Sequence, residues 1–149
     1  MRQAQDSRGF SLIELMITLV VIGLIAAIAI SNLVAAIDRG KQKQTLADMR
    51  TIGTAIEAYA IDHSQYPVSS DMATLWVQVT PTYLRPMTQH DGWDHVFIVD
   101  AATTAYTISS SGKDGVASGC AVGVRITQFT QDICFSHGIF IQYPEGQQY

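Results

Sequence analysis

The amino-acid sequence predicts an α+β fold in which one long N-terminal helix packs on a small antiparallel sheet of about three strands. Two patterns support this prediction: an apolar run that turns into one-sided apolar periodicity, and short β-rich runs separated by turn residues after residue 95. The chain has 149 residues, of which 48% are hydrophobic and only 15% charged. In soluble domains, about a quarter of the residues are usually charged. This length accommodates one small domain with an appendage.

We expect the chain to divide into a short polar N-terminal segment at 1–9, a hydrophobic helix at 10–37 and a globular head at 38–149. Within the head, we expect an amphipathic helix at 38–65, a connecting loop with a short helix at 66–92, and the sheet with C-terminal loops at 93–149. The net charge is −4, from 9 basic and 13 acidic residues, and no basic patch gathers on the head. Nucleic acid is therefore not expected as the main ligand, because such binding relies on neutralising phosphates.

The apolar run from Phe10 to Ile30 is long enough to cross a membrane. As a helix, its 21 residues span about 30 Å, the thickness of the hydrocarbon core of a bilayer. Ala27-Ile28-Ala29 is similar to a signal-peptide cleavage site, but a signal peptide has a shorter apolar stretch. A membrane anchor is therefore the stronger prediction.

Glu14 is the only ionisable residue between Phe10 and Ile37. An acid in the middle of a bilayer costs about 2.5–3.5 kcal/mol, so such an acid usually has a partner or a function, although this one lies near the start of the span. Cleavage between Gly9 and Phe10 would free an amine four residues before Glu14, which places both groups on one helix face. Two basic residues before the segment and three soon after it leave its orientation undecided.

The second half of the predicted helix has one apolar face. Leu46, Met49, Ile52 and Ile56 recur at spacings of three and four, which is typical of an amphipathic helix. Pro67 then ends the helix near His63. Counted from Ser11, the helix exceeds 50 residues.

The remaining elements are short. Helical spacing predicts a helix that contains Met72, Leu75, Trp76 and Val79. A hairpin is expected from strands at 96–100 and 105–109 joined by a four-residue turn, followed by a third strand at 133–143 with a bend or bulge at Gly138.

The segment RGFSLIELM, residues 8–16, resembles the class III leader of type IV pilins and type II secretion pseudopilins. The resemblance implies that a prepilin peptidase cuts after Gly9 and methylates the new amine of Phe10. It also implies that the leader is cytoplasmic and that Glu14 pairs with the amine of a neighbouring subunit during filament assembly. The sequence departs from the family at Ser31, where many members have a proline that loosens the helix.

Three segments of the head are similar to major pseudopilins: DGWDH at 91–95, YTISSSGKDG at 106–115, and residues 129–146. In that family the loop after the second strand binds calcium, and Asp114 and Asp132 match its aspartates. The resemblance therefore implies a structural Ca²⁺ site, since Ca²⁺ takes six to eight oxygen ligands. The alternative is that Asp114-Gly115 is only a turn.

Cys120 and Cys134 are the only cysteines. If the head lies outside the cytoplasm, they are expected to form a disulfide, with buried free thiols as the alternative. The bridge would close a loop of about 15 residues, for which the chain-entropy estimate is about 3 kcal/mol.

The resulting prediction is a structural subunit without enzymatic activity or catalytic residues, held in the inner membrane with a cytoplasmic N-terminus and a periplasmic head. It would polymerise into a type II secretion pseudopilus, closest to the major pseudopilin, together with an inner-membrane assembly platform and minor pseudopilins. A type IV pilus subunit for adhesion, motility or DNA uptake is the runner-up. A membrane-anchored periplasmic enzyme or binding module is an alternative of another class. The closely spaced His90, Asp91, Asp94 and His95 could form a metal or acid–base cluster. A simple turn around Trp93 explains these residues better.

Overall fold

The computed structural model describes residues 9–145 and 148. Two compact units are present, one up to Ala36 and one at Ile37–Tyr149. Helix α1 extends through both, at Leu12–His63, and each unit is described by itself below.

Helix α1 has 52 residues, in agreement with the predicted length. It ends where Ser64 adopts a left-handed backbone with φ of 58°, a common way to terminate a helix, and Pro67 follows. Within the head, Met49, Ile52 and Ile56 are completely buried, which confirms the amphipathic pattern.

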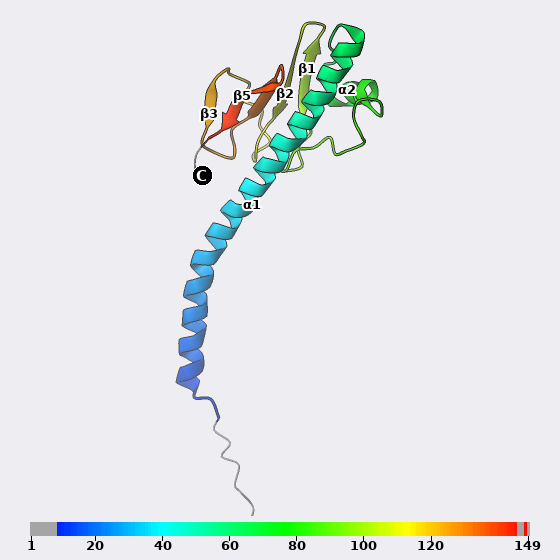
Figure 1. Cartoon of the computed structure of the whole chain (residues 1–149). Coiled ribbons are helices and arrows are strands. Elements are labelled where there is room, and N and C mark those ends of the chain that lie inside the picture. Colours follow the sequence, from blue (N-terminus) through cyan, green and yellow to red (C-terminus); the bar gives the residue numbers. More distant parts are fainter. Residues whose placement is uncertain (1–8, 146–147, 149) are drawn as a thin grey trace, which may run out of the picture. The chain divides into compact units, whose positions relative to one another are not determined.

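The head contains a five-stranded mixed sheet with strands β1 Ile98–Ala102, β2 Ala105–Ser110, β3 Val124–Ile126, β4 Ile133–Ser136 and β5 Ile139–Pro144. The strand order is β1-β2-β4-β5-β3. All neighbours are antiparallel except β3 and β5, which pair in parallel. The sheet lies along the part of α1 that belongs to the head (Figure 1).

The α+β class is confirmed, but the predicted count of about three antiparallel strands is wrong. The expected third strand is a hairpin of β4 and β5, because His137 and Gly138 both have positive φ, 48° and 78°, and this backbone reverses the chain in two residues. Strand β3 was not predicted, and its parallel pairing makes the sheet mixed. The first hairpin is present, with a tighter turn than expected since β1 continues to Ala102.

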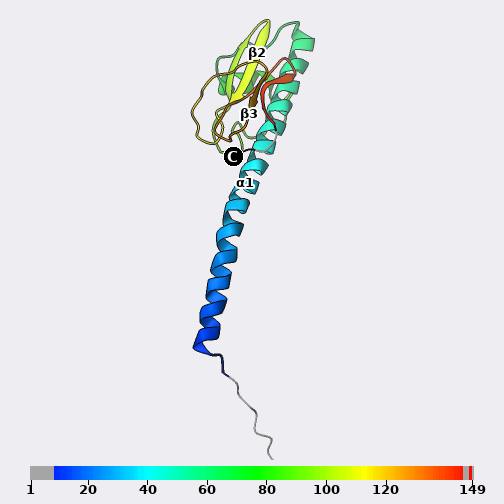
Figure 2. The same ribbon diagram turned by 90° about the vertical axis from the view of Figure 1, so that its left-hand side faces the viewer.

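The core forms between α1, helix α2 at Met72–Val79 and one face of the sheet. Burial alternates along β1, where Val99 and Ala101 face inward, as expected for a sheet covered on one side. The turned view shows α1 running along one side of the strands (Figure 2). One close approach depends on Gly53, because a Cβ at that position would overlap the ring of Phe135 on β4.

Candidate functional site

The N-terminal part of α1 exposes apolar side chains on all its sides. An 18-residue window of this helix has a mean hydropathy of 2.8, and none of it is buried. Large side chains such as Leu12, Leu19 and Ile28 are each more than two-thirds exposed. A helix of this kind satisfies its own backbone hydrogen bonds, so its side chains are suited to lipid or to other apolar helices.

Glu14 lies in the first turn of α1. The turn begins at Ser11, whose carbonyl oxygen accepts hydrogen bonds from the amides of Glu14 and Leu15 at 3.1 and 3.2 Å. Gly9 and Phe10 precede the helix, and Phe10 is 76% exposed. The predicted cleavage site is therefore in an exposed, non-helical stretch, while leader residues 1–8 lie outside the described residues.

At Ser31 the helix is continuous. The Ser31 hydroxyl donates to the carbonyl oxygen of Ile28 at 3.1 Å. Serine retains the backbone amide that a proline lacks, so the helix needs no break here.

Asp38 links the start of the head's helix to two loops. Its Oδ1 accepts a hydrogen bond from the indole nitrogen of Trp93 at 3.2 Å, and its Oδ2 one from Lys113 Nζ at 2.8 Å. Burial of the Asp38 carboxyl raises its pKa, but the hydrogen bonds from Lys113 and Trp93 outweigh this effect, so the pKa lies below its usual value. The sequence did not single out Asp38.

The residues at 90–95 form the turn around Trp93. Asp91 is buried and accepts hydrogen bonds from the amides of Trp93 and His95, both at 2.9 Å, and from the Ser110 hydroxyl at 2.6 Å. His95 Nδ1 lies 2.9 Å from the carbonyl oxygen of Gly112. Among the described residues, no group of three or more His, Cys, Asp or Glu side chains is placed to hold a metal. These contacts support a structural turn.

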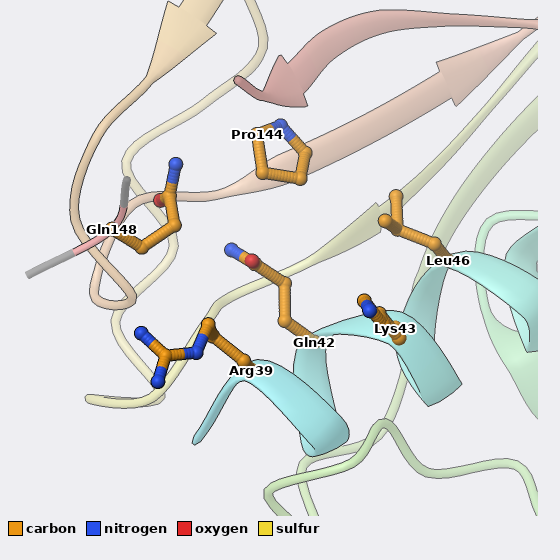
Figure 3. Close-up of a pocket in the computed structure, with 6 residues that line it drawn as sticks. All are labelled: Arg39, Gln42, Lys43, Leu46, Pro144 and Gln148. Atoms are coloured by element: carbon orange, nitrogen blue, oxygen red, sulfur yellow. The ribbon is translucent and has the colours of Figure 1, made fainter. Parts of the chain in front are cut away.

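A shallow groove of about 220 Å³ lies between α1 and the C-terminal end of the sheet (Figure 3). Its lining residues are Arg39, Gln42, Lys43, Leu46, Pro144 and Gln148. Two of its lining side chains, Arg39 and Lys43, are basic, and none is a carboxylate.

Asp132 holds the 116–123 loop, which leads from β2 to β3. It is 1% exposed, and its Oδ2 accepts hydrogen bonds from the amides of Ser118 at 2.7 Å and Gly119 at 2.9 Å. Its other oxygen, Oδ1, is buried without a hydrogen-bond partner.

Two further contacts hold the same loop. Cys120 and Cys134 form a disulfide with a Cα–Cα distance of 5.9 Å. The Ala121 amide donates to Gln142 Oε1 at 2.9 Å, and Gln142 Nε2 donates to the carbonyl oxygen of Asp132 at 2.9 Å. The disulfide expected as one of two alternatives is thus present. Gln142 is a residue that sequence analysis missed, since nothing marks a glutamine within a strand as the partner of a distant loop.

Asp114, the other aspartate expected at a calcium site, is exposed and accepts a hydrogen bond from the Val116 amide at 3.1 Å. Asp114 and Asp132 share no hydrogen-bond partner among the described residues. At Asp132 the loop presents N–H donors, whereas a calcium site requires six to eight oxygens directed at the ion. Oδ1 is the one oxygen of the Asp132 carboxylate without a hydrogen-bond partner, and the amide donors at Oδ2 are not groups that coordinate a calcium ion.

Comparison with known proteins identifies the family. The family model described as type II secretion system (T2SS), protein G matches residues 32–129, and a model described as prokaryotic N-terminal methylation motif matches residues 5–30. Three proteins named type II secretion system core protein G are similar to the chain. The protein from Klebsiella michiganensis is 28% identical over 75% of this chain and 87% of its own length, and that from Escherichia coli K12 is 27% identical over 77% and 88%. The protein from Vibrio cholerae is 23% identical over 85% and 94%.

No solved structure matches the chain significantly. The T2SS protein G model covers about two-thirds of the sequence and extends over the second half of α1, the Trp93 turn and the loop that Asp132 holds. The methylation-motif model covers the described cleavage residues and Glu14. The chain therefore belongs to the type II secretion system protein G family, the major pseudopilins.

Proposed function

We propose that this chain is the structural subunit of a type II secretion pseudopilus and polymerises through the N-terminal part of α1. The observation that carries the proposal is the apolar surface at Phe10–Ile37, which is exposed all round within the chain and has one carboxylate. Removing such a surface from water stabilises an assembly by about 25 cal/mol per Å² of apolar area. In lipid, close packing and the pairing of Glu14 supply the preference for other copies.

Cleavage between Gly9 and Phe10 frees a positively charged amine, which is the partner that the Glu14 carboxylate does not have within the described residues. We propose that a prepilin peptidase performs this step and methylates the Phe10 amine, in line with the matched methylation motif. The amine of one copy then neutralises Glu14 of a neighbouring copy, and only one axial offset between copies allows this pairing.

The proposed location follows from the same features. The subunit first crosses the inner membrane once, with a cytoplasmic N-terminus and a periplasmic head, and membrane lipid covers its apolar segment before assembly. An assembly platform and minor pseudopilins are the further partners that we propose. Family membership favours a pseudopilus over the surface pilus that the sequence left as the runner-up.

The proposal is tested with Glu14→Gln, which removes the charge and keeps the size of the side chain. The matched control is Thr18→Val, one helical turn further along the same face, where the Thr18 hydroxyl only bonds the Leu15 carbonyl of its own helix at 2.9 Å. Both variants are produced with the secretion system in cells, and sheared or cross-linked filaments are measured. Intact mass of the purified subunit locates its N-terminus.

We expect both variants to insert in the membrane and to begin with methylated Phe10. Thr18→Val forms filaments, and Glu14→Gln forms few. Normal filaments from Glu14→Gln would contradict the pairing of Glu14. A native subunit that retains Met1 and stays monomeric in the membrane would contradict the filament function as a whole.

A further inference from the structure

We infer that the 116–123 loop is fixed by Asp132, Gln142 and the Cys120–Cys134 disulfide instead of by calcium, so that the head is ordered without a bound cation. The inference concerns the folded subunit and does not depend on filament formation.

The direction of the hydrogen bonds at Asp132 is the first argument. Two loop amides, from Ser118 and Gly119, point at one oxygen of this buried carboxylate at 2.7 and 2.9 Å. N–H groups carry partial positive charge, so they neutralise the carboxylate as a cation does and repel a cation placed beside them. The acid thus already has its counter-charge from the chain.

The second argument is that two oxygens close to Asp132 already accept hydrogen bonds from the chain. Gln142 Oε1 accepts from the Ala121 amide, and the Asp132 carbonyl oxygen accepts from Gln142 Nε2. The Asp132 Oδ1 atom is buried and free, but a calcium ion takes six to eight oxygens. Asp114, the matching family position, uses one carboxylate oxygen on its own turn at Val116.

The third argument is covalent closure. The disulfide joins Cys120 in the loop to Cys134 in β4, and it stands between the amides bound by Asp132 and the amide bound by Gln142. The Gly123 amide then donates to the carbonyl oxygen of Ile141 at 2.7 Å. The loop is therefore held at 118, 119, 120, 121 and 123, and it has no unsupported stretch in which an ion would be needed to order the backbone.

The experiment uses the full-length oxidised protein in detergent, with either EGTA or millimolar calcium chloride. Both tryptophans, Trp76 and Trp93, lie in the head, so the thermal shift of tryptophan fluorescence reports the Tm of the head alone. Hydrogen exchange measures protection of the Ser118, Gly119 and Ala121 amides in the same samples. The variants are Asp132→Ala and the control Asp114→Asn, which alters the exposed aspartate.

We expect the oxidised wild-type protein to show the same Tm and the same protected loop amides in EGTA and in calcium. Reduction of the wild-type disulfide lowers the Tm and removes protection from the loop, and Asp132→Ala removes protection at 118 and 119. Asp114→Asn leaves both measurements unchanged.

A rise in Tm of the oxidised wild-type protein with calcium, or loop amides protected only when calcium is present, would overturn the inference. Loop protection that survives reduction would overturn the role of the disulfide. These measurements on the wild-type protein decide the question even if Asp132→Ala does not fold. They are made on dispersed subunits, so their outcome is separate from that of the filament experiment.

Discussion

Replacing Gly53 by alanine tests how closely α1 and β4 pack. An added Cβ would overlap the ring of Phe135. This ring is 4% exposed and stacks edge-on against Phe140 with a centroid distance of 4.8 Å, so it cannot move aside without disturbing the core. Overpacking of this kind costs about 1–3 kcal/mol, whereas alanine in place of glycine gains up to about 1 kcal/mol in helix propensity.

Gly40→Ala is the matched control, because Gly40 lies in the same helix and an added Cβ meets nothing within 4 Å. The gain in propensity is common to both variants, so the difference between them isolates the overlap. We expect Gly53→Ala to be less stable than Gly40→Ala by about 1–3 kcal/mol. Denaturation followed by tryptophan fluorescence measures both. Equal stability of the two variants would refute the close packing at Gly53.

Two further substitutions test polar contacts in the head. For Asp38→Asn we expect lower stability than wild type at neutral pH. The pKa of Asp38 in the folded head lies below its usual value of 3.8, so the ionised carboxylate stabilises the fold above pH 3.8, and this stabilisation is lost as the pH falls through the folded pKa. The difference between variant and wild type in urea titrations should therefore shrink below about pH 4, and a difference independent of pH would contradict the ion pair with Lys113. For Tyr106→Phe we expect a loss of about 1–3 kcal/mol in stability, because the buried hydroxyl donates to the Glu57 carboxylate on α1 and accepts from the Gly138 amide at 3.1 Å. Tyr83→Phe, which removes an exposed hydroxyl contact, is the control. Equal losses in the two variants would contradict a stabilising role of the buried Tyr106 hydroxyl.

The parts of the fold that the sequence predicts are those with local signals. The periodicity of Met49, Ile52 and Ile56 predicts α1, and Pro67 predicts where it ends. Strand β3 has only three residues, and its parallel partner β5 is distant in sequence, so no local pattern distinguishes it from a loop. The two-residue turn at His137 looks in the sequence like a bend in one strand, because the residues on both sides are β-formers.

The candidate sites divide in the same way. Glu14 stands out in the sequence because it is a lone acid in an apolar helix. For the two cysteines, the sequence leaves only two alternatives, a disulfide or free thiols. The contacts of Asp132 were not predictable, since a sequence does not show whether a loop turns its N–H or its C=O groups toward a carboxylate. The same applies to Asp38 and Gln142, whose partners come from distant segments.

The two parts of α1 differ in how strongly they constrain the orientation of a neighbouring copy in an assembly. In the head, α1 commits one side to its own sheet, so the sides of that part are not equivalent. Between Phe10 and Ile37 exposed apolar side chains lie on every side of the helix. Away from Glu14 and the few other polar positions, turning this segment about its own axis therefore changes little in what a neighbour meets. In a filament of the proposed kind, Glu14 fixes the rise from one copy to the next and the helix face that carries the pair, while the polar surface of the heads supplies any further constraint on the rotation of each copy about its axis.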